Sequence, residues 1–542
     1  MVFQRLPPFR AWPVIALACL VALASWEVGL ARDRASALPD RYLVLIVLDG
    51  FRPDYLNLVP MRHLHALMQA GTTYSRAWVG QLETQTPAGH ATLVTGVYPR
   101  KHGVMGFGWR SPTGQSFSWM PTNLPQLEGG AMENLIESGG VPTLSDLMHR
   151  RDPFAKSASL SAEKYYAADA MGTGADYILY GKRIGPHQDK GIQATPIGRH
   201  VPPANSFYHE ADVTGPPYPE VQDQFVARLG VQLLRTVRPR LLLLNLPGTD
   251  IEGHLTGGVL ERSRMQVVIA GVDKAIGAVV GAYKRAGLYD RTVFVVTADH
   301  GMVPSTHIVP VKAMYAAARA TGAPLLEDDF LSTAGYLYLR NPALAGEVAA
   351  HLGPQHFAGV EGALFKVSGA KGSSCALETA TARALGPNLS RAYVDLCNTI
   401  AGPDGPDVVL PYEEDAMGLT VPHAQHWGNH GGLSWRTQHI PLVISGPGVR
   451  RAQSQFPAQL VDVAPTVERL LGYPVPSGVD GVVLADAVRS ASNRDVSLQG
   501  TIQSRRSSDI NALLAHSLQQ SGAEVRPRVA VSRSVPSHRD PK

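Results

Sequence analysis

Acidic and imidazole side chains follow three apolar segments of this sequence, at the points where strands are expected to end. Asp49 follows the run that begins at residue 41, and Asp299 and His300 follow the run that begins at residue 291. Asp250 and His254 come after four consecutive leucines, and because they are four residues apart, a helical turn would place both on one face. Carboxylate and imidazole groups are typical zinc ligands. The pattern therefore predicts that these side chains meet at a metal site.

Thr86 begins the stretch TPAGHATLVTG, in which small residues lead into an apolar run with helical character. A threonine hydroxyl holds its proton at neutral pH and needs a base or a metal ion to become a nucleophile. We expect it at the start of a helix, where backbone N–H groups favour an anion. Taken alone, a threonine in this position is more commonly an N-cap. The candidate role of Thr86 as a nucleophile depends on the ligand-type residues elsewhere in the chain.

His430 completes the candidates, because the two glycines after it permit a tight backbone approach. His423, His426 and His439 are nearby, and spacing alone does not separate them from His430. Zinc suits these donors best, with manganese or iron as substitutes. We expect two cations, one held by Asp49, Thr86, Asp299 and His300, the other by Asp250, His254 and His430.

The overall composition is that of an ordinary globular protein. The chain has 542 residues, of which 44% are hydrophobic and 17% charged. This is long enough for one large α/β domain with inserted subdomains, or for two domains. The net charge of +4 is too small to indicate binding to a nucleic-acid polymer or to a membrane surface. The three cysteines form no CxxC pattern, which excludes a cysteine-based zinc site.

The N-terminal segment, residues 1–31, has the features of an export signal. Arg5 and Arg10 precede an apolar run over residues 14–26, and small residues follow at positions 29 and 31. The run is short for a membrane span, and the alternative is an uncleaved N-terminal membrane anchor. We therefore expect a periplasmic or secreted protein. An oxidising compartment would allow Cys375 and Cys397 to pair, but the sequence does not distinguish a disulfide from two unrelated buried thiols.

The arrangement of apolar runs predicts an α/β domain over residues 41–487. The runs at 41–50, 238–246 and 291–297 are apolar on both faces, as in parallel strands buried between helices. Helices are expected over 60–70, 222–236 and 262–285. Ligands of such sheets lie beyond the carboxyl ends of the strands, which is where the candidate residues are expected.

Three segments depart from this alternation of expected strands and helices. Residues 182–218 are rich in proline, glycine and histidine, which predicts a lid or loop insertion. Residues 309–410 predict a small α+β insertion. From residue 489 to 542 the composition turns to serine, arginine and glutamine, which predicts a largely disordered tail, although 509–520 has the pattern of a short helix.

Several stretches resemble the alkaline phosphatase superfamily and, within it, the type I phosphodiesterase/nucleotide pyrophosphatase family. The matching motifs are LIVLDG from Leu45, TPAGHATLVTGVYPRKHGV from Thr86, DIEGH from Asp250, TADHGM from Thr297 and NHGG from Asn429. The resemblance covers about residues 41–487. It implies an alkaline-phosphatase-like three-layer sandwich with a mostly parallel central sheet and small inserted cap subdomains. It also implies two metal ions and a covalent phosphothreonine intermediate on Thr86.

Two further positions bear on the substrate that the resemblance implies. Members of this family commonly have an asparagine five residues after the His-Gly histidine, where it binds a substrate oxygen, and the residue here is Phe107. Lys164 matches a lysine that contacts a dianionic group in related phosphomonoesterases and phosphonate hydrolases. Their arginine two positions later is Tyr166 in this chain. A lysine favours a terminal phosphate, whereas a phenylalanine favours a diester or an aromatic substituent.

The leading hypothesis is an exported two-metal hydrolase of small-molecule phosphate esters, either diesters or nucleotide pyrophosphates. A phosphomonoesterase or phosphonate hydrolase of the same superfamily is the nearest alternative. A phosphomutase or a binding protein that has lost catalysis is a further one. Thr86 argues against a lost active site, and the apparent export signal argues against a cytosolic mutase.

Overall fold

The fold is described from a computed structural model. The described residues are 40–111, 113–119, 124–188, 190–199, 213–214, 218–258, 262–326, 334–370, 372–418 and 427–523. The expected export signal or anchor at residues 1–31 lies outside this part of the chain, as do His423 and His426.

A mixed sheet of 10 strands forms the centre of the fold, in the order β21-β2-β20-β10-β1-β9-β5-β6-β7-β8. The middle strands from β10 to β6 are parallel, and antiparallel pairs join them to the strands on both sides. Every residue of β1 is buried, as expected of a strand that is apolar on both faces. The predicted α/β class is confirmed. The strand bounds are β1 Tyr42–Leu48, β2 Thr72–Tyr74, β5 Ser157–Ala162, β6 Tyr177–Ile184, β7 Gly191–Pro196, β8 Val213–Thr214, β9 Leu241–Leu246, β10 Thr292–Thr297, β20 Leu442–Ser445 and β21 Ala452–Ser454.

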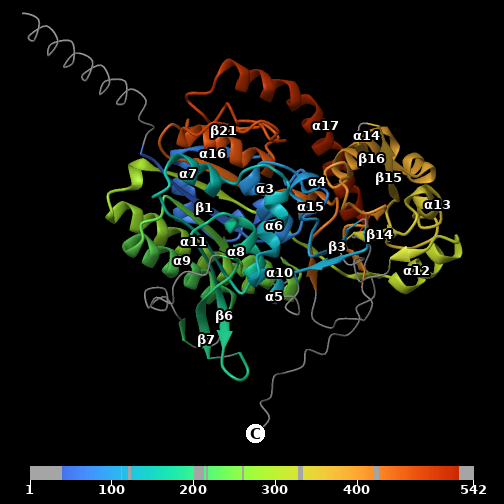
Figure 1. Cartoon of the computed structure of the whole chain (residues 1–542), viewed down its shortest axis with the longest axis horizontal. Coiled ribbons are helices and arrows are strands. Elements are labelled where there is room, and N and C mark those ends of the chain that lie inside the picture. Colours follow the sequence, from blue (N-terminus) through green and yellow to red (C-terminus); the bar gives the residue numbers. More distant parts are fainter. Residues whose placement is uncertain are drawn as a thin grey trace, which may run out of the picture. The chain divides into compact units, whose positions relative to one another are not determined.

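Two groups of helices pack on this sheet (Figure 1). The first group consists of α2 (Arg62–Ala70), α9 (Pro219–Thr236), α10 (Gly248–Thr256) and α11 (Arg262–Arg285). The second consists of α3 (Thr86–Thr95), α6 (Ala131–Ser138), α8 (Tyr165–Gly172) and α16 (Val463–Leu471). Among the described residues, α11 is the one helix long and apolar enough to cross a membrane, and 61% of its apolar window is buried within the fold, in part against α9.

The described part of the predicted lid at residues 182–218 is mainly a β-hairpin. Strands β6 and β7 pair antiparallel from Leu179 with Pro196 to Ile184 with Gly191, and β8 adds to β7. The hairpin therefore extends the central sheet at this edge. Residues 200–212 and 215–217 lie outside the described part of the chain.

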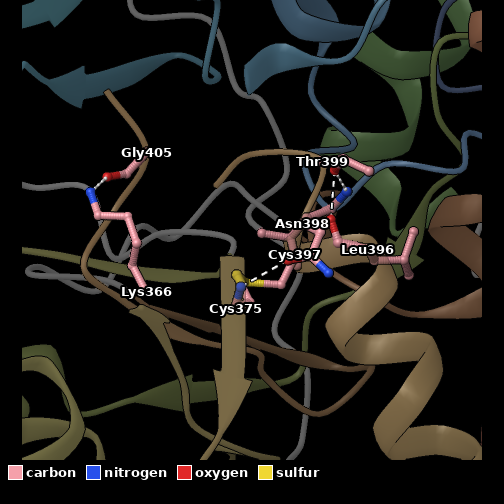
Figure 2. The surroundings of a disulfide bond; sticks show 8 residues. Lys366, Cys375, Leu396, Cys397, Asn398, Thr399 and Gly405 are labelled. Atoms are coloured by element: carbon pink, nitrogen blue, oxygen red, sulfur yellow. Dashed lines mark hydrogen bonds between the residues drawn. A yellow bond between two sulfur atoms is a disulfide. The ribbon is translucent and has the colours of Figure 1, made fainter. Parts of the chain in front are cut away.

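A second sheet occupies the predicted α+β insertion, in yellow and orange in Figure 1. Its five strands lie in the order β13-β14-β17-β15-β16, with an apolar core of its own. Cys375 on β16 and Cys397 at the end of α14 form a disulfide bond, and Asn398 Oδ1 accepts a hydrogen bond from the backbone N–H of Cys375 at 2.8 Å (Figure 2). The bounds are β13 Leu325–Leu326, β14 Gly335–Leu339, β15 Leu364–Gly369, β16 Gly372–Leu377, β17 Val408–Leu410, α12 Val311–Ala320, α13 Ala345–Ala350 and α14 Thr379–Cys397.

The C-terminal segment differs from the prediction of a largely disordered tail at residues 489–542. The structure has a 31-residue helix, α17 (Asn493–Ala523), and α17 packs against α14. Ile510 and Leu513 are buried, while Arg506 donates hydrogen bonds to both carboxylate oxygens of Asp462 at 2.5 and 3.1 Å. A few buried side chains and several ion pairs with other elements, including Arg506 with Asp462 and Arg391 with Asp509, hold this helix, and average composition does not reveal such contacts.

Candidate active site

Three aspartates lie where the central parallel strands end. Asp49 directly follows β1, Asp299 follows β10, and Asp250 is in the first turn of α10, after β9. Because β9, β1 and β10 are parallel neighbours, their carboxyl ends meet at one edge of the sheet. All three side chains are buried, and the backbone N–H of Gly50 donates to Asp299 Oδ1 at 3.2 Å. The topology therefore brings together three acidic groups that are far apart in sequence.

Two histidines lie against Asp250 in the same cluster. His254 Nε2 and His430 Nε2 are 3.4 and 3.3 Å from Asp250 Oδ1. His254 is one helical turn after Asp250 on α10, as the four-residue spacing predicts. His430 follows the short strand β19 (Gly428–Asn429). The alternative His439 instead stacks on Trp435 and faces the backbone carbonyl of Ser75.

His300 lies between the other two aspartates. Its Nε2 atom is 3.3 Å from Asp299 Oδ2 and 3.5 Å from Asp49 Oδ1. The ring of His300 stacks on that of His430, with centroids 3.5 Å apart. His300 thus joins the two halves of the cluster.

All three imidazoles are oriented in the same way. The Nδ1 atoms of His254, His300 and His430 lie 2.8 to 2.9 Å from backbone carbonyl oxygens. A carbonyl only accepts hydrogen bonds, so each Nδ1 carries the proton and each Nε2 presents a lone pair to the aspartates. Burial lowers the pKa of His300, and burial with the neighbouring His300 lowers the pKa of His430 well below its ordinary value. The rings of His300 and His430 are therefore neutral, which is the form of histidine that binds metals.

Thr86 is the first residue of α3, and its side chain is buried beside this cluster. Its Oγ1 atom is 3.2 Å from His300 Nε2 and 3.4 Å from Asp49 Oδ1. The N-cap of α3 is Gln85, so Thr86 is not a helix cap. Gly89 allows α3 to come this close, because a Cβ there would lie 3.0 Å from the Cβ of Asp299.

Lys164 supplies a positive charge inside the cluster. Its Nζ atom is 3.0 Å from Asp49 Oδ1, hydrogen-bonds Asp250 Oδ2, and lies 3.5 Å from Thr86 Oγ1. Burial by itself would lower the pKa of Lys164, but the charges of Asp250 and Asp49 outweigh it and raise the pKa well above its ordinary value. The ammonium group is therefore charged and lies next to the hydroxyl of Thr86.

The three carboxylates differ in their surroundings. Burial and the neighbouring Asp299 raise the pKa of Asp49 to about 7, and burial likewise raises the pKa of Asp299 to about 7. Burial also opposes ionisation of Asp250, but its pKa is lowered, chiefly by the charge of Lys164. One lysine therefore does not compensate the three buried acids.

The donor set fits divalent cations. Potential ligand atoms of Asp250, His300 and His430 lie within 4.8 Å of one another, as do those of Asp49, Asp299 and His300. Asp250 Oδ1 and Asp299 Oδ2 are buried and have no hydrogen-bond partner among the described residues. Because the lone pairs of three imidazoles face these oxygens, the arrangement is repulsive unless cations lie between them. Oxygen and nitrogen donors in this combination suit zinc.

A cavity of about 630 Å³ opens beside the cluster. Its polar part is formed by Glu163, Lys164, Arg183, Asp250, His254 and His430, and its apolar part by Phe107, Trp119, Tyr165, Tyr166, Ile251 and Leu255. Phe107 packs edge to face on Tyr166, with ring centroids 4.9 Å apart. The two residues predicted to contact substrate, Lys164 and Phe107, both lie on the wall of this cavity.

Two residues of the site were missed by sequence reasoning. Asn245 on β9 donates to Asp49 Oδ2 at 3.0 Å and lies 3.1 Å from His90 Nε2. His90 on α3 in turn contacts the backbone carbonyl of Thr86 at 2.8 Å. Both residues orient groups next to the nucleophile candidate. For Asn245 the sequence did hold a signal, since it is the one polar residue in the apolar strand LLLLNL.

Comparison with solved structures identifies the fold. The alkaline phosphatase PafA aligns with a TM-score of 0.63 and 15% identity, over 84% of this chain and 100% of that one. Murine ectonucleotide pyrophosphatase/phosphodiesterase 5 in complex with AMP aligns with a TM-score of 0.53 and 18% identity, over 80% of this chain and 96% of that one. The fold is therefore the alkaline-phosphatase-like α/β fold predicted from the sequence.

The sequence identifies the family among proteins of this fold. The family model for type I phosphodiesterase/nucleotide pyrophosphatase matches residues 43–358, more than half of the chain, and the chain belongs to this family. A pyrophosphatase/phosphodiesterase of Schizosaccharomyces pombe is 24% identical over 294 residues, which cover 54% of this chain and 51% of the relative. This chain thus spans about half the length of that relative.

Proposed function

We propose that this chain hydrolyses phosphodiesters or nucleotide pyrophosphates through a covalent phosphothreonine on Thr86. The observation that carries the proposal is the position of Thr86 Oγ1 at the start of α3, 3.2 Å from His300 Nε2 and 3.4 Å from Asp49 Oδ1. A hydroxyl needs such surroundings to act as a nucleophile. Family membership supports this choice, as does the AMP bound to the murine relative.

Two divalent cations, most simply zinc, belong to this proposal. Asp49, Thr86, Asp299 and His300 would hold one of them, and Asp250, His254 and His430 would hold the other. When bound, such cations lower the pKa of a coordinated hydroxyl and neutralise charge on phosphoryl oxygens.

The side chains of the protein then perform two displacements at phosphorus. In the first, Thr86 Oγ1 forms a bond to phosphorus, the bond from phosphorus to the leaving oxygen breaks, and the hydroxyl proton of Thr86 passes to solvent or to the departing group. In the second, a water oxygen forms a bond to phosphorus, the bond from phosphorus to Thr86 Oγ1 breaks, and a proton from the water restores the Thr86 hydroxyl as the product leaves. Lys164 Nζ, 3.5 Å from Thr86 Oγ1, is placed to pair with a phosphoryl oxygen in both steps.

The cavity wall supports a substrate with an uncharged substituent on the phosphate. Phe107 and Tyr166 present apolar faces where an asparagine and an arginine would give polar contacts. A second candidate, hydrolysis of phosphomonoesters or phosphonates, is favoured by Lys164, because an ammonium group beside the nucleophile suits a dianionic phosphate. Phe107 and Tyr166 favour the diester over this alternative.

Activity on two chromogenic substrates, measured side by side, tests the proposal. We expect zinc-loaded enzyme to turn over bis(4-nitrophenyl) phosphate with a higher kcat/KM than 4-nitrophenyl phosphate. Thr86→Ala should lose about a thousandfold or more of this activity, whereas Thr86→Ser keeps the hydroxyl and should retain a measurable part of it. Faster turnover of the monoester would favour the second candidate, and full activity of Thr86→Ala would exclude the covalent mechanism.

We also propose that the protein is exported to the periplasm or the medium. The disulfide between Cys375 and Cys397 supports this, because such bonds persist mainly in oxidising compartments. Fractionation of the producing cells, with mass spectrometry of the N-terminal peptide, tests export and distinguishes a cleaved signal from a retained anchor. Recovery of the protein in the cytosol with both thiols free would contradict the proposal.

A further inference from the structure

Glu133 and Asp169 form a buried acidic pair outside the candidate active site. Glu133 is on α6 and Asp169 is on α8, and both are 0% exposed. Gly198, which follows β7, lies against both of them. A Cβ at Gly198 would be 3.1 Å from Asp169 Oδ1 and 3.2 Å from Glu133 Oε2. The two carboxyl groups therefore face the same small space.

Most of the oxygens of this pair are unsatisfied. Asp169 Oδ1, Asp169 Oδ2 and Glu133 Oε1 are buried and have no hydrogen-bond partner among the described residues. Glu133 Oε2 alone accepts a hydrogen bond, from the backbone N–H of Arg199 at 2.7 Å. Buried carboxylates are rare in proteins unless a partner or a metal ion neutralises them. The unsatisfied oxygens therefore point to a positively charged partner at this position.

Arg199 compensates the charge of the pair only in part. Its Nε atom is 3.4 Å from Glu133 Oε2, while its Nη2 atom pairs with Glu137, whose side chain is 44% exposed. One guanidinium thus faces three carboxylates, and Asp169 accepts no hydrogen bond from it. A cation of higher charge beside Asp169 would balance the cluster.

We propose that Glu133 and Asp169 bind a hard divalent cation, with calcium as the best fit. Calcium takes six to eight oxygen ligands in flexible geometry and accepts carboxylates that bind through one or both oxygens. The three unsatisfied oxygens supply part of such a shell, and water can supply the rest. Magnesium demands a stricter octahedron, and zinc prefers nitrogen or sulfur donors, which this space does not offer among the described residues.

The position of this site gives the cation a structural role. Helix α8 begins next to Lys164, which is its N-cap residue, and Tyr165 and Tyr166 in its first turn line the cavity. A cation between Asp169 and Glu133 would tie α8 to α6 and to the end of β7. It would therefore stabilise the wall that carries Lys164 whatever reaction the site performs.

Metal content and thermal stability test this site without reference to catalysis. Full-length, zinc-loaded protein is incubated with calcium chloride and desalted, and bound metals are counted by mass spectrometry. We expect one calcium per chain and a rise of about 2–4 °C in the thermal midpoint as calcium is added. Asp169→Asn should lose both effects and keep its zinc. Glu137→Gln, on the same helix as Glu133, should keep both effects.

The competing explanation is a proton shared by the two carboxyl groups, since burial and the charge of Glu133 raise the pKa of Asp169 well above its ordinary value. In that case the wild type binds no calcium beyond its zinc, and the proposal is wrong. Equal calcium binding by Asp169→Asn would also overturn it. If Asp169→Asn does not fold, Glu133→Gln serves in its place, and if neither folds, the calcium count of the wild type decides.

Discussion

Replacing Arg506 with methionine should release α17 from the rest of the fold. Arg506 is on the inner face of α17, and its two terminal nitrogens bind Asp462 at 2.5 and 3.1 Å. The side chain of Asp462 is 0% exposed and that of Arg506 is 10% exposed. Methionine keeps much of the apolar volume, including the part near Phe456, but removes the charge.

The size of the effect follows from what remains around Asp462. Removing one partner of a buried ion pair costs about 3–5 kcal/mol, because the other charge is left uncompensated. Asp462 also accepts hydrogen bonds from the backbone N–H groups of Gln459 and Val482, both at 2.9 Å. These two bonds continue to stabilise the carboxylate, so we expect the low end of the range, about 3 kcal/mol. That corresponds to about a hundredfold in an opening equilibrium.

Native-state hydrogen exchange of the α17 amides measures this opening directly. The matched control is Arg505→Met, one residue earlier on the same helix, where the arginine pairs with Asp395 and is 68% exposed. An exposed pair contributes about 0–1 kcal/mol, so protection should fall less than about fivefold in the control. A similar small loss in both variants would refute the reasoning that the Arg506–Asp462 pair holds α17 in place.

Three further predictions concern the subdomain, the end of α17 and the candidate metal site. The Cys375–Cys397 bond closes a loop with a sequence separation of 22, so a variant with both cysteines replaced by alanine should lose about 3 kcal/mol of stability. Calorimetry that shows no decrease in the thermal midpoint would contradict this prediction. Burial alone would lower the pKa of His516, but the hydrogen bond and the charge of Glu361 raise this pKa above its ordinary value of 6.5. The contact between His516 and Glu361 therefore stabilises the fold at low pH. This stabilisation is lost as the pH rises through the folded-state pKa of His516. The thermal midpoints of wild type and His516→Gln should therefore converge as the pH rises above the ordinary histidine pKa of about 6.5, and a constant difference would disprove the role of this contact. Removal of bound metal ions by a chelator should lower the thermal midpoint, because the buried charges of Asp49, Asp250 and Asp299 are then uncompensated. Added zinc should restore the midpoint. A midpoint unaffected by the chelator would argue against bound cations.

The positions of the three aspartates could be predicted because parallel strands have a strong sequence signal. A strand buried on both faces is a continuous apolar run, and the first polar residue after it marks the ligand edge of the sheet. Asp49 and Asp299 follow such runs, and Asp250 follows one after a short turn. Lys164 has no such signal, and only the family resemblance indicated it as a residue of the site.

Contacts between distant, mostly polar segments could not be predicted in the same way. Asn245 and His90 belong to different elements, and nothing in their local sequence links them to Asp49 or Thr86. The same holds for α17, which depends on pairs such as Arg506 with Asp462. Such pairs form only when the fold brings them together, so composition alone predicted disorder for this segment.

Identification of the covalently modified residue during turnover tests the central claim most directly. Zinc-loaded enzyme is mixed with bis(4-nitrophenyl) phosphate, quenched in acid within the first turnover, digested and analysed by tandem mass spectrometry. The proposed mechanism predicts a phosphoryl adduct on the side chain of Thr86, absent from Thr86→Ala. An adduct on another residue, or hydrolysis by Thr86→Ala at the wild-type rate, would contradict the proposal that Thr86 is the nucleophile.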